Sequence, residues 1–171
     1  METYAIKNLS FRYPETGIDV LKDITFSVNE GEFITVCGPS GCGKSTLLRH
    51  LKPDLSPHGV LSGEIFFEEK PISDLSHREQ SSKIGFVMQS PENQIVTDKV
   101  WHELASLGYD NNTIRKRVAE TASFFGIQNY FEKNVLELSG GQKQILNLAS
   151  IMAMQPSVLI LDEPTSQLDP I

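Results

Sequence analysis

One short stretch of the chain combines the side chains that proteins use to hold phosphate groups. It follows an apolar run at 33–37 and reads Gly38-Pro39-Ser40-Gly41-Cys42-Gly43-Lys44-Ser45-Thr46. The glycines let the backbone turn tightly and aim N–H groups inward, while the helix expected after the stretch presents the positive end of its dipole. Lys44 would reach the β- and γ-phosphates, and the Ser45 hydroxyl would coordinate Mg²⁺. The pattern predicts a phosphate-binding loop for a nucleoside triphosphate; the alternative is a glycine-rich turn that happens to precede a helix.

A second candidate for chemistry is the apolar run 158–161, which ends in the acids Asp162 and Glu163. An acid at the carboxyl end of a strand beside a phosphate-binding loop can hold Mg²⁺, and the next acid can orient an attacking water. We therefore predict that Asp162 binds the metal and that Glu163 is catalytic. A strand end with two solvated acids is the alternative, and the presence of the phosphate-binding loop argues against it.

The third motif stands between the other two and reads Leu138-Ser139-Gly140-Gly141-Gln142. Adjacent glycines after a serine make a helix N-terminus whose amides and hydroxyl can bind a phosphate, although a simple serine cap would also explain the serine. In this order, the three motifs resemble the nucleotide-binding domain of ATP-binding cassette (ABC) proteins. The resemblance implies that Ser139, Gly140, Gly141 and Gln142 contact ATP held by the phosphate-binding loop of a second ATPase subunit, identical or different, in a head-to-tail dimer.

Other positions match the family one by one. Tyr13 resembles the aromatic residue that stacks on adenine, although an ordinary hairpin aromatic would look the same. Gln89 resembles the glutamine that contacts the γ-phosphate and Mg²⁺ and links the catalytic site to a membrane partner. Residues 166–169 resemble the segment that couples the two sites of the dimer. The resemblance implies catalytic roles for Lys44, Gln89 and Glu163, and metal-binding roles for Ser45, Gln89 and Asp162.

The stretch 89–105 is similar to the energy-coupling factor type of ABC importer ATPase, which powers uptake of vitamins or of cobalt and nickel ions. The resemblance implies a transmembrane partner subunit and a cytoplasmic, peripheral place on the inner face of the membrane. Apolar residues recur there at helical spacing and would either receive a helix of that partner or pack in the core. They are Val96, Val100, Leu104 and Leu107.

Composition limits the classes of partner. The 171 residues carry a formal net charge of −7, which argues against broad attraction to nucleic acid or anionic lipid. No apolar run approaches the ~20 residues that span a bilayer, and the N-terminus lacks a signal peptide pattern. A long coiled coil between the motifs, typical of cassette proteins in DNA repair, is also missing, so we expect a cytoplasmic protein that does not bind nucleic acid.

The expected fold is α/β, with one domain over 1–171 built on a P-loop NTPase core. Alternating residues at 3–10 and 23–28, and a short strand pattern at 63–67 after a turn-rich segment, predict an N-terminal antiparallel β subdomain. Continuous apolar runs at 33–37, 84–88 and 158–161 predict a parallel sheet. Helical periodicity at 98–107, 111–125 and 140–154 predicts an inserted α-helical subdomain. The core would comprise about 1–88 and 156–171, and the helical subdomain about 89–155.

The sequence stops at Ile171, directly after the segment 166–169. The resemblance places a switch histidine and further strands beyond this point, so we expect these C-terminal strands to be missing and residues 33–37 to lie at an exposed sheet edge. Two functions therefore stay open. The chain is a transport ATPase, or it binds ATP with negligible hydrolysis.

Overall fold

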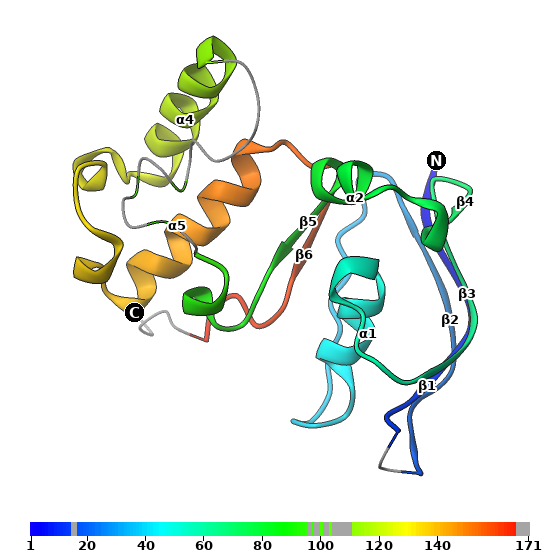
Figure 1. Cartoon of the computed structure of the whole chain (residues 1–171). Helices are drawn as coiled ribbons and strands as arrows, with labels where there is room; N and C mark the ends of the chain where they lie inside the picture. Colours follow the sequence, from blue (N-terminus) through cyan, green and yellow to red (C-terminus); the bar gives the residue numbers. More distant parts are fainter. Residues whose placement is uncertain (15–16, 96, 98–99, 101–102, 104–110, 167–171) are drawn as a thin grey trace. The chain divides into compact units, whose positions relative to one another are not determined.

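The computed structural model describes the chain except for residues 15–16, 96, 98–99, 101–102, 104–110 and 167–171 (Figure 1). It separates into two compact units, 1–80 and 81–171, which are described in turn. This division joins residues 81–88 and 156–171 to the helical residues. The predicted grouping of 1–88 with 156–171 as one nucleotide-binding core stays a prediction.

The N-terminal unit is built on an antiparallel sheet, as the alternating pattern predicts. Its strands are β1 (Glu2–Arg12), β2 (Asp19–Asn29), β3 (Val60–Phe67) and β4 (Lys70–Pro71), in the order β2-β1-β3-β4. Alternate side chains of β1 are buried, Tyr4 and Ile6 among them, because successive residues of a strand point to opposite faces. Two short 3₁₀ helices complete the unit, at Pro53–Leu55 and Ile72–Asp74.

Helix α1 (Lys44–His50) packs on the buried face of this sheet (Figure 1). The Tyr4 hydroxyl donates a hydrogen bond to the Leu51 carbonyl at 2.7 Å, and Leu47 is buried. Burial of an aliphatic or aromatic side chain stabilises a fold by about 1.5–3 kcal/mol, so these contacts hold the middle and the C-terminal end of α1 against the sheet.

We expect the last residue of α1, His50, to make the free energy of unfolding depend on pH. Its ring is 2% exposed, contacts the Phe11 ring edge to face with centroids 4.5 Å apart, and has no hydrogen-bond partner for either nitrogen among the described residues. Burial disfavours the charged imidazolium and lowers the pKa of His50. The unfolded state therefore binds more protons, so the free energy of unfolding should fall as pH drops through about 6.5.

The change that tests this is His50→Leu, with His58→Leu as the control at an exposed histidine. Urea unfolding of both variants and the parent between pH 7.5 and 5 measures the effect. We expect the loss of stability on acidification to shrink in His50→Leu and to persist in His58→Leu. An unchanged slope in His50→Leu would show that other groups control this range.

The C-terminal unit begins within α2 (His77–Lys83) and contains a parallel strand pair, β5 (Ile84–Val87) and β6 (Val158–Leu161). All residues of β5 are buried, as expected for a parallel strand covered on both faces. Among the described residues, this unit also contains α4 (Asn111–Phe125) and α5 (Gly140–Ala153), with 3₁₀ turns at Pro91–Asn93, Gln128–Tyr130 and Val135–Glu137. Both helices contribute to one core, whose members include Val118, Ala122, Leu146 and Ala149.

The predicted strand at 33–37 is wrong. These residues form no strand, and Phe33 is 90% exposed and Ile34 46% exposed. A strand exists only where its backbone pairs with a neighbour, and the only parallel partners in the described residues, β5 and β6, pair with each other. An apolar run shows that a segment can be buried, but it does not show that a neighbouring strand is available to pair with it.

The predicted helix at 98–107 lies mostly outside the described residues, and so do Val96, Leu104 and Leu107 of the apolar stripe. Val100 is described, and its side chain is 1% exposed within the core of α4 and α5. At that position the stripe is core, which was one of the two predicted alternatives.

Candidate functional site

The phosphate-binding loop enters α1 through a left-handed residue. Gly43 immediately precedes the helix with a φ of 100°, a conformation that L side chains rarely adopt. A Cβ atom at this position would also lie 3.1 Å from both a methyl carbon and the carbonyl oxygen of Val20. Glycine is therefore required here by the backbone and by β2, independently of any ligand.

Lys44 is held across this loop. Its ammonium donates hydrogen bonds to the carbonyl oxygens of Gly38 and Pro39, each at 3.0 Å. The loop residues 38–42 are exposed, so the positive charge is placed beside open backbone rather than in the core. This arrangement suits an anionic ligand, because an ammonium bonded to neutral carbonyl oxygens can exchange them for the negatively charged oxygens of a phosphate, which attract it more strongly.

Tyr13 lies close to the loop within the same unit. Its hydroxyl is 3.1 Å from the Thr46 hydroxyl, and the edge of its ring meets Phe11 with centroids 4.9 Å apart. The structure thus brings Tyr13 to the first turn of α1, beside the residues predicted to bind phosphate. Its stacking on adenine stays a prediction.

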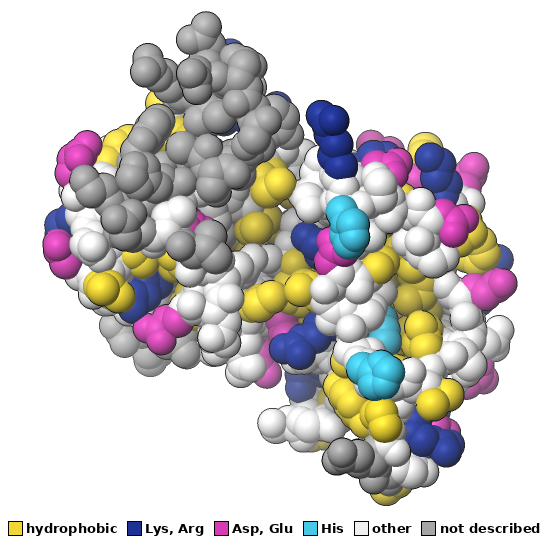
Figure 2. All heavy atoms as spheres, viewed as in Figure 1, with side chains coloured by type: hydrophobic (Ala, Val, Ile, Leu, Met, Phe, Trp, Pro, Cys, Tyr) yellow, Lys and Arg dark blue, Asp and Glu magenta, His cyan; other side chains and the backbone are white. Residues whose placement is uncertain are grey.

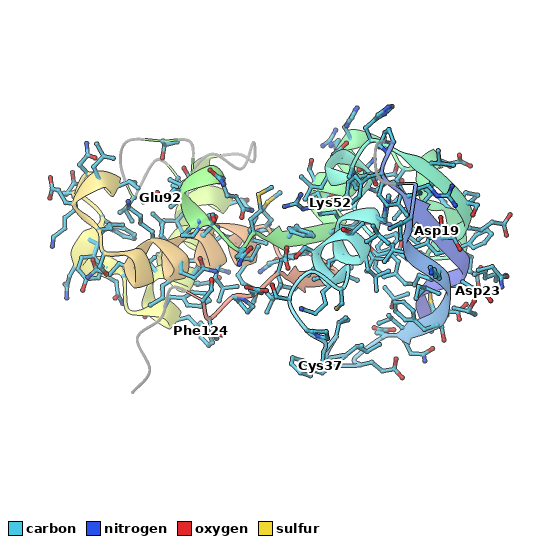
Figure 3. All side chains as sticks on the ribbon, turned by 90° about the horizontal axis from the view of Figure 1, so that it is seen from below. Asp19, Asp23, Cys37, Lys52, Glu92 and Phe124 are labelled. Carbon is cyan, nitrogen blue, oxygen red and sulfur yellow. The ribbon has the colours of Figure 1, made fainter. Side chains whose placement is uncertain are left out.

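Cys42 provides a chemical probe of the loop. Both cysteines are free and exposed, and Cys37 lies on the segment that leads into the loop, away from the sheet (Figure 3). In a Cys37→Ser variant, maleimide should modify Cys42 alone and abolish binding of fluorescent ATP, because an adduct would fill the loop. ATP should protect the thiol. Full binding after complete modification would show that Cys42 faces away from the ligand.

In the C-terminal unit, two predicted catalytic side chains meet. The Gln89 side-chain amide donates a hydrogen bond to the Glu163 carboxylate at 2.6 Å. They meet because β5 and β6 are parallel and each residue follows the carboxyl end of its strand; the Asp162 amide continues the pairing by donating to the Val87 carbonyl at 3.0 Å. Chain segments far apart in the sequence thereby form one carboxylate and amide pair.

Glu163 has an unusual backbone. Its φ of 49° lies in the left-handed region, which costs a residue with a side chain about 1 kcal/mol or more. Such conformations persist where the surroundings hold them, and they are common at catalytic sites. Here the conformation accompanies the contact with Gln89, while the adjacent Asp162 is 4% exposed.

The start of α5 shows that the serine of the third motif is a helix cap. The Ser139 hydroxyl accepts a hydrogen bond from the Gln142 amide, and the Gln142 side chain accepts one from the Ser139 amide at 2.9 Å. This reciprocal pair is a capping box, and it fixes the helix N-terminus with Gly140 exposed. Contact of Ser139, Gly140, Gly141 and Gln142 with nucleotide stays a prediction.

The predicted metal ligands form an oxygen donor set: the Ser45 hydroxyl, the Gln89 amide oxygen and the Asp162 carboxylate. Mg²⁺ prefers such ligands. Because the Gln89 amide nitrogen contacts Glu163, its oxygen is the atom left to face a metal. Ser45 belongs to the N-terminal unit and the other two to the C-terminal unit, so the set as a whole stays a prediction.

The sequence did not reveal Gln94 and Asn147, which contact each other in the C-terminal unit. Gln94 stands in the stretch that carries the importer resemblance, but an amide in a polar segment gives no sign of its partners.

No helix in the described ranges of the chain is long and apolar enough to cross a membrane.

The exposed glycine-rich loop with its bonded lysine, the two acids that follow β6 beside the parallel strand β5, and the capped helix that begins at Gly140 are the features of a nucleotide-binding protein of the P-loop class. The sequence matches the family profile described as ABC transporter over residues 21–166. The chain belongs to the ABC transporter family.

Relatives support the same assignment. The chain is 46% identical over 170 residues to a putative ABC transporter ATP-binding protein of Bacillus anthracis, covering 97% of this chain and 31% of that protein. It is 41% identical to the energy-coupling factor transporter ATP-binding protein EcfA of Methanocaldococcus jannaschii, covering 96% of this chain and 60% of the relative. The chain thus spans between about a third and three fifths of the length of these proteins.

Two solved structures share the fold. CbiO1 of Clostridium perfringens, described as part of the ABC transporter complex CbiONQ, superposes with a TM-score of 0.82 at 34% identity, covering 98% of this chain and 68% of CbiO1. The ATP-binding cassette MJ0796, in a dimeric post-hydrolysis state with ADP and phosphate, gives 0.81 at 28% identity, covering 97% and 76%. The mixed α/β ABC ATPase fold predicted from the sequence is confirmed.

Proposed function

We propose that this chain is the ATP-binding and ATP-hydrolysing part of an ABC importer of the energy-coupling factor class. The observation that carries the proposal is the 2.6 Å contact between Gln89 and Glu163 at the ends of two parallel strands, in a chain whose other unit carries the lysine-tethered loop. In the proposed reaction, the lysine binds phosphate and the carboxylate positions the water, which are the two tasks that phosphoryl transfer to water requires.

Each residue has a place in the proposed reaction. Lys44 and the amides of the loop bind the β- and γ-phosphates, and the oxygen donors of Ser45, Gln89 and Asp162 hold Mg²⁺. The Mg²⁺ ion neutralises phosphate charge when bound. Glu163 orients the attacking water and accepts its proton, and Gln89 holds that carboxylate in position.

The proposed partners follow from the family. The segment Ser139–Gln142 of one subunit contacts ATP on the loop of a second ATPase subunit, so that ATP binding closes a dimer and hydrolysis opens it. A transmembrane subunit converts this cycle into uptake of a micronutrient such as a vitamin or metal ion, with the chain on the inner face of the cell membrane. The similarity to EcfA and to CbiO1 supports this class of transport.

No nucleic-acid partner is proposed. The net charge of −7 is unfavourable for binding a polyanion. On the face shown in Figure 2, lysine and arginine side chains of the N-terminal unit alternate with aspartate and glutamate side chains, which is not the distribution of a nucleic-acid site.

The test is Mg²⁺-dependent phosphate release by the purified 171-residue chain over a range of protein concentrations. A rate that rises faster than linearly with concentration is expected, because the proposed site forms only between two subunits. ATP binding without any turnover would instead support the alternative of an ATP-binding protein with negligible hydrolysis. Absence of ATP binding would overturn both.

A further inference from the structure

The side-chain amide of Gln94 makes three hydrogen bonds, and the proposed function gives this residue no role. Its side-chain oxygen accepts hydrogen bonds from the Met88 amide at 2.9 Å and from the Asn147 side chain at 2.8 Å. Its side-chain nitrogen donates to the Phe86 carbonyl at 2.6 Å. A single amide therefore bonds to the backbone on both sides of Val87, directly before Gln89, and also to α5.

The polarity of this arrangement is fixed by the backbone. The Met88 N–H can only donate and the Phe86 carbonyl can only accept, so the oxygen and nitrogen of Gln94 cannot exchange places. The Asn147 atom that faces the Gln94 oxygen must then be its nitrogen. The backbone at the end of β5 therefore fixes the orientation of the Gln94 amide, and the Gln94 oxygen in turn fixes the orientation of the Asn147 amide.

Asn147 is a strong anchor for this contact. Its side chain is 0% exposed in the middle of α5, and its own oxygen has no partner among the described residues. A buried amide with one unpaired atom depends on the bond it does make, since loss of that bond leaves both ends unpaired. The contact with Gln94 is therefore costly to break.

A second link lies beside the first. Lys143, also on α5, forms a 2.8 Å ion pair with Glu92 on the turn Pro91–Asn93, and this bond lowers the pKa of Glu92 (Figure 3 labels Glu92). Glu92 is largely exposed, so the pair contributes little by itself. It keeps the turn against α5 and helps to hold Gln94 within reach of Asn147.

The geometry points to Gln94 as a positioning residue that ties the backbone at Phe86 and Met88, directly before Gln89, to α5, the helix that Ser139 caps. A displacement of α5 would be transmitted by the Gln94 amide to the backbone next to Gln89, and by the Gln89 side chain to Glu163. The inference rests on the proposed function for its catalytic consequence, but the mechanical link concerns only residues within the C-terminal unit.

The test compares Gln94→Met, which keeps the length of the side chain and removes all of these bonds, with Gln94→Glu, which keeps the acceptor and loses the donor. The matched control is Gln128→Ala, which removes an exposed amide of the same unit. Amide hydrogen exchange at Met88 and Gln89, followed by NMR or mass spectrometry, is the first readout. Loss of one such hydrogen bond is expected to speed exchange of the Met88 amide about tenfold in Gln94→Met, with a smaller change in Gln94→Glu and none in the control.

Asn147→Leu, alone and combined with Gln94→Met, distinguishes a specific effect of the contact between Gln94 and Asn147 from a general loss of stability in the C-terminal unit. We expect Asn147→Leu to speed exchange at Met88 only when Gln94 is present. Unchanged exchange in Gln94→Met, or an equal effect of Asn147→Leu with and without Gln94, would overturn the inference. Thermal unfolding of each variant checks that the fold is retained.

The second readout is activity. Gln94→Met should lower kcat about tenfold, while the dissociation constant for ATP stays within about twofold, because Lys44 and the loop amides, which bind the β- and γ-phosphates in the proposed function, lie in the other unit. An equal loss of binding and turnover would count against a positioning role. Absence of turnover in the parent would refute the proposed hydrolysis, and hydrogen exchange would still decide the role of Gln94.

Discussion

MgATP binding is expected to weaken about a hundredfold when Lys44 is replaced by alanine, since hydrogen bonds to a charged group contribute about 1.5–3 kcal/mol. In the structure the ammonium already lies across the loop, bonded to the carbonyls of Gly38 and Pro39 at 3.0 Å. The variant loses the charge that should contact phosphate and also the bridge between these carbonyls. Titration with a fluorescent ATP analogue measures the dissociation constant.

Lys22→Ala is the matched control, because it removes the same charge from an exposed position on β2 of the same unit. Its affinity for ATP should equal that of the parent. A second variant, Lys44→Arg, keeps the charge but changes its geometry, and we expect an intermediate affinity. Equal affinity in Lys44→Ala and the parent would refute the phosphate-binding assignment of the loop.

The second large effect is expected from Glu163→Gln. General base catalysis contributes about 10²–10⁴-fold, so kcat should fall by at least about a hundredfold while ATP binding is preserved. The amide oxygen of the new side chain can still accept the bond from Gln89, so the local structure should survive. Phosphate release under saturating ATP, together with the ATP titration, separates chemistry from binding.

Glu132→Gln provides the comparison, because it makes the same change at an exposed acid of the C-terminal unit. Its turnover should match the parent. With hydrolysis blocked, Glu163→Gln should also accumulate as a dimer in MgATP, which light scattering would detect. Turnover near the parental rate in Glu163→Gln would assign the base to another group.

The elements were predictable wherever local patterning and local structure coincide. The run 158–161 is β6, residues 111–125 are α4, and the alternating segment at 3–10 lies within β1. The motif residues Gln89 and Glu163 were predicted from separate parts of the sequence, and the structure brings them into contact. Periodicity and motif spacing carry this information because each depends on neighbours along the chain.

The sequence could not show which strands pair or which distant side chains form hydrogen bonds with each other. The run at 33–37 has the composition of a buried strand, yet strand formation depends on a neighbour that composition does not specify. Gln94 and Asn147 look like ordinary polar residues, and only the fold shows that one caps the end of β5 while the other anchors it from α5. Buried polar networks are set by tertiary geometry, so no local pattern reveals them.

The contact between Gln89 and Glu163 also bears on how the chain acquires its site during synthesis. These residues are 74 positions apart, and β5 has no strand partner among the described residues until β6 has been made. Parallel pairs that enclose so long a segment form late, because the entropy of closing the loop must be overcome before the pairing stabilises anything. The N-terminal unit closes its sheet within the first 71 residues. During synthesis, the N-terminal unit with the predicted phosphate-binding loop would therefore fold well before the Glu163 carboxylate is held in position by Gln89.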